Sequence, residues 1–327
     1  MRSVVLAATV AAALAATVGG CGAGGESYAA LRHPFRGATL LVDADSPAAH
    51  WRDGHDAAWL DPIADTPQAR WLTGPDDLAD LGPVLDAARK GKALPVVVIY
   101  HIPDRDCAGP NAGGAADAGA YARFITRTVG VLGNSGSAVI LEPDAVAAEC
   151  FDDARAAMLT DASRALAEAG HHVFLDAGHP RWRGQAETAE RLRRSGITSA
   201  EGFSVNVSNR QSTADSHRWG LALSRLVGDR EMVIDTSRNG LPAPPDDQWC
   251  NATPQGLGQP PTTDPGLDRV AALLWIKSPG ESDGPCGRDE PPAGVFSPAQ
   301  ARALIANAPW LPAAARQAAT EARAPVT

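Results

Sequence analysis

The sequence predicts an α/β fold, a single TIM-like barrel of alternating strands and helices with acidic side chains around one mouth. Its clearest strand is the apolar run 138–141, which passes directly into Glu142, Pro143 and Asp144. Such a run is typical of a strand that is buried on both faces. Pro143 cannot donate a hydrogen bond to a neighbouring strand, so the strand ends there. Asp144 is therefore expected at the carboxyl end of a sheet, where α/β barrels carry their catalytic groups.

The same pattern recurs along the chain, and the chain has the right length for a barrel. Further apolar runs that end in polar or acidic segments lie at 95–100, 173–176, 232–235 and 272–277. Strands alternate with helices about eight times, as a single barrel requires. The 327 residues fit one such domain of about 250 residues with insertions.

The first half of the chain supplies a strand at 39–43, a short helix that begins at Ala48, and a short strand within 65–74 that carries Trp71. The helices expected in this half are an amphipathic one at 75–90 that stops at Gly91, one at 113–130 with apolar residues at helical spacing, and a long alanine-rich one at 145–169.

The second half continues with a charged helix at 185–194, a strand at 202–207 and a helix at 213–227. The loop 241–265 is rich in proline and glycine, and a loop of that length inside a compact domain is usually functional. A strand within 267–277 and a helix at 297–308, which begins with Ser-Pro, complete the domain.

Both ends of the chain are predicted to lie outside the barrel. Arg2 precedes an apolar core that is too short to span a membrane, which is typical of an export signal. Cys21 follows small residues, as at a bacterial lipoprotein processing site, and we expect it to carry a lipid anchor; simple cleavage and release is the alternative. The predicted segments are a signal at 1–20, a tether at 21–34, the barrel at 35–316 and a tail at 317–327.

Charge and cysteine content limit the kinds of partner and the cellular compartment that the sequence suits. The net charge is −9 and no basic block is present, which argues against a nucleic-acid partner and suits an uncharged one. In an oxidising compartment the remaining cysteines are expected to form two disulfides, and the sequence leaves three pairings open. They are Cys107, Cys150, Cys250 and Cys286, and no two of them are spaced as in a zinc knuckle.

Several loops together resemble glycoside hydrolase family 6. The matching segments occur in the family's order and span nearly the whole predicted domain. They are 100–107 (YHIPDRDC), 141–144 (LEPD), 176–182 (DAGHPRW), 202–209 (GFSVNVSN), 234–240 (IDTSRNG), 249–251 (WCN) and 277–284 (KSPGESDG).

The resemblance implies a distorted barrel that hydrolyses β-1,4-glucan with inversion, without a cofactor or metal, and disulfides Cys107–Cys150 and Cys250–Cys286. Inversion needs a proton donor on one side of the sugar and an activated water on the other, with carboxyl groups about 6.5–9.5 Å apart. Asp144 matches the family's general acid, and Asp106 matches the neighbouring carboxylate that keeps it protonated and helps to order the water. Asp283 matches the residue usually discussed as the base.

The resemblance also implies sugar-binding residues. Tyr100 matches the residue beneath the distorted sugar, and three indoles match platforms for glucose rings: Trp71, Trp182 and Trp249. Polar residues expected to bind sugar hydroxyls are Asp176, Asn206, Asn251, Lys277 and Glu281. Trp275 lies inside a predicted strand and is expected in the core, whereas Trp51 is undecided.

Structural roles compete with the catalytic ones, which we favour. The alternative for Asp144 is an N-cap on a helix beginning at Ala145. For Asp106 it is an ion pair with Arg105 or another arginine, and for Tyr100 it is core packing.

Other polar residues are expected to be structural, or are left open between two roles. Asp235 and Arg238 are expected to form an ion pair, and His179 to be a hydrogen-bonded loop residue. Asp176 is left open between sugar binding and loop holding, and Lys277 with Glu281 between sugar binding and a mutual pair.

Two positions depart from the family pattern, and they concern subsite preference. Asn is common where His101 stands, and an aromatic residue where Arg210 stands. The segment 283–296 is short, which predicts an open cleft and internal cutting. The protein is expected to be a monomer. The alternatives are an exo-acting cellobiohydrolase, a non-catalytic glycan-binding protein, and a metal-dependent hydrolase using Asp176, His179 and Asp144.

Overall fold

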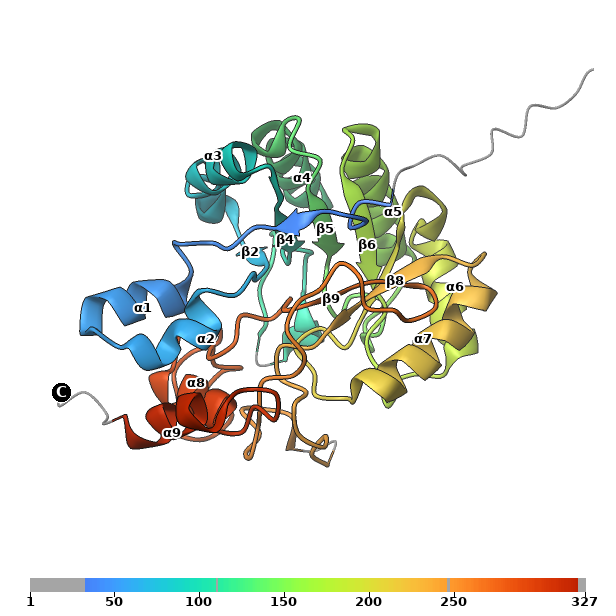
Figure 1. The fold of residues 1–327 in the computed structure, drawn as a ribbon. Coiled ribbons are helices and arrows are strands. Elements are labelled where there is room, and N and C mark those ends of the chain that lie inside the picture. Colours follow the sequence, from blue (N-terminus) through green and yellow to red (C-terminus); the bar gives the residue numbers. More distant parts are fainter. Residues whose placement is uncertain (1–32, 110, 246–247, 323–327) are drawn as a thin grey trace, which may run out of the picture. The chain divides into compact units, whose positions relative to one another are not determined.

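A seven-stranded parallel sheet forms the centre of the computed structural model, which describes residues 33–109, 111–245 and 248–322 (Figure 1). Neighbouring strands pair in parallel in the order β2–β4–β5–β6–β7–β8–β9, with one register shift in the β8–β9 pair, between Met232 and Val233. The strands are β2 (Arg70–Leu72), β4 (Val96–Ile99), β5 (Ala138–Leu141), β6 (His172–Asp176), β7 (Gly202–Val205), β8 (Glu231–Asp235) and β9 (Val270–Leu274). The predicted signal, the tether through Arg32, and Cys21 lie outside the described residues.

The barrel is open rather than closed, which corrects the expectation of about eight full strand–helix alternations. The edge strands β2 and β9 are not paired along their length; they approach where Ala69 N donates to Trp275 O at 3.0 Å. The expected first strand contributes only β1 (Thr39–Leu40), which pairs with β3 (Ala93–Leu94) outside the main sheet. The sheet is therefore a curled, partly open barrel of the distorted kind that the family resemblance implies.

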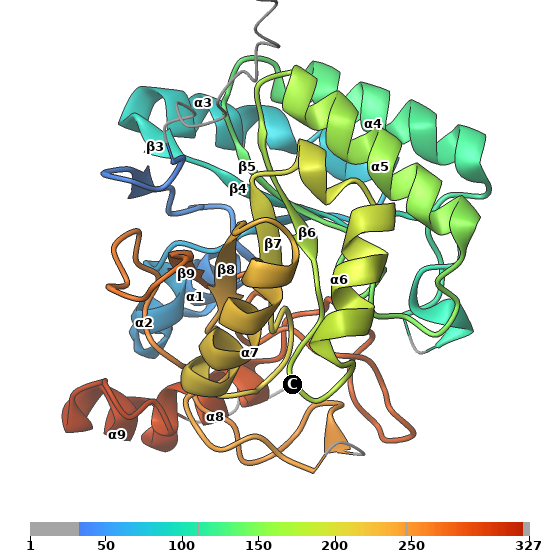
Figure 2. The same ribbon diagram turned by 90° about the vertical axis from the view of Figure 1, so that its right-hand side faces the viewer.

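Both faces of the sheet are buried, which explains why the strands carry apolar residues on both sides. In β4, Val97 and Ile99 pack against the outer helices, whereas Val98 faces the interior together with Phe174. Helices α4, α5, α6 and α7 cover the outer face, as Figure 2 shows. The outer helices are α3 (Leu81–Gly91), α4 (Ala118–Leu132), α5 (Asp153–Glu168), α6 (Gln185–Arg194) and α7 (Thr213–Leu226).

A second helical group packs around Trp275, next to the sheet edge at β9. It comprises α1 (Pro47–His55), α2 (Asp61–Ala64), α8 (Pro298–Ala306) and α9 (Ala313–Glu321), which lie together in Figure 1. Trp275 is 1% exposed, so the expectation of a core role is confirmed. Trp51 packs against Trp59 and Phe296 in the same region. The short 3-10 helices are η1 (Ala58–Leu60), η2 (Pro75–Leu78), η3 (Asp106–Ala108) and η4 (Ile197–Ser199).

Several element boundaries differ from the prediction. The alanine-rich stretch is not helical from residue 145, because α5 begins only after Asp152, whose side chain accepts a hydrogen bond from Arg155 N at 2.8 Å. The amphipathic stretch at 75–90 divides into η2 and α3. The predicted tail boundary at 316 falls inside α9, where Ala319 is fully buried.

Both disulfides join the cysteines that the family resemblance pairs. Cys107 is bonded to Cys150, and Cys250 to Cys286. Within the described ranges, no helix is both long enough and apolar enough to cross a membrane.

Candidate active site

A cavity of about 440 Å³ lies over the carboxyl ends of the sheet strands. Each sheet strand, or the loop that follows it, contributes to the lining, because parallel strands end at the same edge of a sheet. The predicted site residues that line it are Trp71, Tyr100, Asp106, Asp144, Trp182, Trp249, Lys277 and Asp283.

Asp144 is presented to the cavity by the end of β5. Its backbone is left-handed, with φ of 71°, and its N–H donates to Asp176 Oδ2 at 2.8 Å. No helix begins at Ala145, so Asp144 is not a helix cap. Burial raises the pKa of the Asp144 carboxyl well above its usual range, and the charges of Asp176, Asp106 and Asp283 add to the effect. A carboxyl in this setting keeps its proton at pH values where an ordinary aspartate has lost it.

Asp106 reaches the cavity from the loop that follows β4. Its Oδ2 accepts a hydrogen bond from Asn111 N at 2.7 Å, and the adjacent Cys107 ties this loop to Cys150. The alternative of an ion pair with Arg105 is wrong. That guanidinium donates instead to the carbonyl oxygens of Tyr100 and Asn111, at 2.8 and 3.0 Å.

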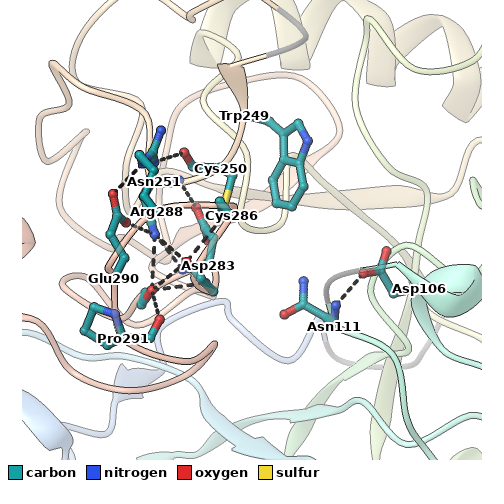
Figure 3. The surroundings of a disulfide bond; sticks show 12 residues. Asp106, Asn111, Trp249, Cys250, Asn251, Asp283, Cys286, Arg288, Glu290 and Pro291 are labelled. Atoms are coloured by element: carbon teal, nitrogen blue, oxygen red, sulfur yellow. Dashed lines mark hydrogen bonds and ion pairs between the residues drawn. A yellow bond between two sulfur atoms is a disulfide. The ribbon is translucent and has the colours of Figure 1, made fainter.

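Asp283 is held by cations and a backbone amide. Its Oδ1 accepts from Arg238 Nη1 at 2.8 Å, and its Oδ2 from Arg210 Nη2 at 3.2 Å and Asn251 N at 2.9 Å. Burial alone would favour the protonated form. Arg238, Arg210 and Lys277 outweigh it and hold the pKa of Asp283 well below its usual range. Figure 3 shows Asp283 near the Cys250–Cys286 disulfide, with the Trp249 ring and Asn111 to one side and Asp106 beyond Asn111.

The expected ion pair of Asp235 with Arg238 is wrong, because Arg238 is paired with Asp283. Asp235 is fully buried and accepts from backbone amides of the loops after β7 and β9: Ser208 N at 2.9 Å and Lys277 N at 3.0 Å. It also accepts from Ser237 N at 2.9 Å. The carboxylate therefore joins neighbouring loops.

Asp176 and Glu142 also join neighbouring loops, at the ends of their own strands. Asp176 is fully buried and accepts from Asp144 N, Gly178 N and Ser204 Oγ, which favours loop holding over sugar binding. Glu142 accepts from His101 N at 3.0 Å and from Ile102 N at 3.1 Å. Burial raises the pKa of both carboxyls to about 7, against the opposing effect of these hydrogen bonds.

The two asparagines predicted to bind sugar are also placed behind the cavity wall. Asn206 is fully buried; its amide donates to Asp235 O at 2.8 Å and accepts from Gln211 N at 2.9 Å. Asn251 is 4% exposed, and its Oδ1 accepts from Asp283 N at 2.7 Å. These polar atoms bond within the protein, which favours positioning roles, and direct sugar contact by either residue stays a prediction.

Lys277 and Glu281 form a pair with 3.1 Å between Nζ and Oε2. Lys277 lines the cavity, whereas Glu281 stands behind it and is 9% exposed. Lys277 Nζ also lies 5.5 Å from the centre of the Trp71 ring. The mutual pair that was left open is therefore present, and sugar binding by Lys277 and Glu281 stays a prediction.

Aromatic faces line the cavity at several places. Trp71 and Tyr100 meet edge to face, with ring centres 5.5 Å apart, and Trp71 Nε1 donates to Ile276 O at 2.8 Å. Trp182 and Trp249 remain 37% and 42% exposed. Fixed and exposed indoles of this kind suit the apolar faces of sugar rings.

Sequence reasoning did not single out Ser208, Gln211 and Arg181, which line the cavity. Ser208 and Arg181 lie within the matched segments 202–209 and 176–182, whereas Gln211 lies outside all of them. Glu142 could have been predicted from the sequence, because it lies at the carboxyl end of its strand, as Asp176 and Asp235 do. In the described parts of the chain, no three His, Cys, Asp or Glu side chains gather as metal ligands would. Asp176, His179 and Asp144 therefore do not form the trio that a metal-dependent hydrolase needs.

Comparisons with known proteins agree on one family. The model for Glycosyl hydrolases family 6 matches residues 38–308. Endoglucanase 1 of Streptomyces halstedii is 39% identical over 288 residues, which cover 81% of this chain and 88% of that protein. A probable exoglucanase, GH6D, of Podospora anserina is 30% identical over 73% of this chain and 67% of its own length.

Among solved structures, the endoglucanase Cel6 from Mycobacterium tuberculosis, in complex with methyl-cellobiosyl-4-deoxy-4-thio-β-D-cellobioside, superposes with a TM-score of 0.79. It is 38% identical, and the match covers 85% of this chain and 99% of that one.

Proposed function

This chain belongs to glycosyl hydrolases family 6, and from that premise we propose that it is an exported, inverting endoglucanase that cuts internal β-1,4-glucosidic bonds of cellulose or a related β-glucan. The observation that carries the proposal is the cavity in which Asp144, with its raised pKa, lies beside further carboxylates and exposed indoles. Export rests on the sequence of residues 1–20, and secretion or a lipid anchor at Cys21 are both compatible with it.

In the proposed reaction Asp144 gives its proton to the glycosidic oxygen as the bond to the anomeric carbon breaks. A water attacks the opposite face of the sugar and loses its proton, which leaves the product with inverted configuration. Both steps use only carboxyl chemistry that the cavity supplies.

The partners of the other two carboxylates argue for a division of roles. Asp283 has a strongly lowered pKa and accepts from Arg238, Arg210 and Asn251, so it is a poor proton acceptor. We assign it the role of a fixed negative charge that stabilises the positive charge developing on the sugar. The proton of the attacking water then passes toward Asp106, a revision of the expectation that Asp283 is the base.

Internal cutting is supported by the loop after Asp283. This loop folds back on itself, with Gly294 N donating to Ser282 O and Ser282 N to Val295 O, both at 2.9 Å. Its base is tied to the neighbouring loop by the Cys250–Cys286 disulfide. The exposure of Trp182 and Trp249 also suits a groove that admits the middle of a chain.

One contact favours the alternative of an exo-acting cellobiohydrolase. Arg181 Nη1 donates to Pro244 O at 3.1 Å, which joins two loops that line the cavity. Incubation with carboxymethylcellulose decides between the two modes. Internal cutting lowers viscosity early, with few reducing ends released, whereas exo action releases cellobiose with little change in viscosity.

The proposal as a whole is tested with wild type and Asp144→Ala on carboxymethylcellulose and barley β-glucan. We expect hydrolysis by wild type and a fall of about 10²–10⁴-fold in the variant, the usual contribution of a general acid. Full activity in the variant would refute the assignment of Asp144. Binding of cello-oligosaccharide by wild type without turnover would show a glycan-binding protein instead.

A further inference from the structure

Arg210 is a buried arginine at the cavity wall. The proposed mechanism accounts for its contact with Asp283 but not for its other contacts. It follows β7 in the loop that also carries Ser208, lines the cavity, and is only 5% exposed. Burying a guanidinium carries a large desolvation cost unless its hydrogen bonds are well used. The contacts that Arg210 makes therefore indicate what it contributes.

Those contacts join separate loops. Nη1 donates to Trp249 O at 2.7 Å, and Nη2 donates to Asp283 Oδ2 at 3.2 Å and to Gln255 Oε1 at 3.4 Å. One planar group thus holds the carboxylate after β9 and the backbone of the residue that presents the Trp249 ring. The shortest of these bonds is the one to Trp249.

Electrostatics do not by themselves account for Arg210. Asp283 is already paired with Arg238 at 2.8 Å, and Lys277 also favours its ionised form. Burial and the nearby Arg238 lower the pKa of Arg210 to about 10, so it remains charged at neutral pH. Placing a second guanidinium beside Arg238 is unfavourable if its charge is its only contribution. Only arginine, however, has a planar fork of N–H groups that can donate to two separate acceptors at once.

We propose that Arg210 is a positioning residue that fixes the Trp249 indole relative to Asp283, and so sets the affinity for the glucose unit that stacks on that indole. This inference rests on the proposed function, since it assigns Trp249 to a β-1,4-glucan chain. It predicts that Arg210 acts on binding through the ring of Trp249.

A double-mutant cycle tests the inference, with cellohexaose as the probe and both Kd and steady-state kinetics as readouts. We expect Arg210→Met to weaken binding about tenfold, and the loss to fall mainly on KM and not on kcat. In the Trp249→Ala background the same change is expected to cost under about twofold, because no ring is left to position.

Matched variants separate charge from geometry. Arg210→Lys keeps the charge beside Asp283 but cannot reach both acceptors, so it is expected to behave like Arg210→Met. Arg218→Met removes an arginine from the exposed surface of α7 and is expected to leave Kd unchanged. Thermal melting of each variant checks folding, and if Arg210→Met does not fold, Arg210→Lys takes its place in the cycle.

The inference is overturned if Arg210→Met costs the same factor with and without the Trp249 ring. It is equally overturned if the loss falls on kcat while Kd is unchanged, which would mean that Arg210 acts through Asp283. Kd is measured in the Asp144→Ala background, where little cellohexaose is consumed. Binding there, with no cleavage by wild type, would refute the proposed function and still leave this coupling measurable. Wild type that neither binds nor cleaves would overturn both.

Discussion

The carboxylates at the mouth of this sheet differ in whether they reach the cavity. Glu142, Asp176 and Asp235 are fully buried and accept hydrogen bonds from backbone amides. Asp106, Asp144 and Asp283 line the cavity. Acidic residues at similar positions therefore either hold loops from within the protein or face the cavity, and only the three-dimensional structure distinguishes the two.

At the residue scale, the raised pKa of Asp144 has a pH consequence. Burial is its main cause, and the negative charge of Asp106 contributes. A proton donor works only while it is protonated, so activity should fall as pH rises through the pKa of Asp144. Asp106→Asn removes one like charge, which lowers that pKa. We expect the alkaline limb of the kcat/KM profile to move to lower pH in this variant.

The pH of the alkaline limb is the quantity to compare. The maximum rate is less informative, because it also falls in Asp106→Asn if Asp106 takes up the proton of the attacking water. Asp53→Asn, an exposed aspartate on α1, serves as the control and should leave the limb in place. An alkaline limb that stays at the wild-type pH in Asp106→Asn would contradict the electrostatic coupling.

At the scale of elements, carboxylates hold together loops from adjacent strands. Glu142 at the end of β5 binds amides after β4, and Asp176 at the end of β6 binds Asp144 N after β5. Asp235 at the end of β8 binds amides after β7 and β9. This lateral bonding positions each cavity-lining loop against its neighbour, and the Cys107–Cys150 disulfide reinforces the loop of Asp106.

Glu142→Gln tests this bonding through stability against pH. The pKa of Glu142 is about 7 in the folded protein, above the unfolded value of about 4.3. The folded state thus holds this proton more tightly, and its stabilising contribution is present below about pH 4.3 and is lost as pH rises to about 7. Glutamine does not titrate, so Tm of the variant should fall less than that of wild type between pH 4.5 and 8.

Asp176 has the same sign of shift and remains in this variant, so part of the slope should persist. The exposed Glu168→Gln provides the control, with a pH dependence of Tm like that of wild type. Parallel Tm curves for Glu142→Gln and wild type would show that Glu142 does not bind its proton more tightly on folding.

At the scale of the whole molecule, the sequence predicted the elements best where local pattern decides. The charged helix at 185–194 is α6 to the residue, and the apolar strand before Asp144 is β5. The region 145–152 was predicted as helix from its alanines and is not helical. There, Asp144 N is bonded to Asp176 and Cys150 to Cys107, so tertiary contacts override propensity.

The parts of the site that escaped prediction depend on contacts distant in sequence. Arg210 meets Asp283 across a separation of 73 residues, and no local pattern signals such a pairing. The opening between β2 and β9 is likewise set by how the whole sheet curls. Motif resemblance identified the cavity-lining acids and indoles, but it could not distinguish residues that touch the cavity from Asn206 and Asn251, which support it.

The central claim, that Asp144 donates the proton in an inverting site, is tested most directly by the anomeric form of the first product. Proton NMR during hydrolysis of cellohexaose resolves the α and β anomers before mutarotation mixes them. We expect the α anomer to appear first, because water attacks opposite the leaving group. A β anomer that appears first would contradict the account, since it would require retention through a covalent intermediate.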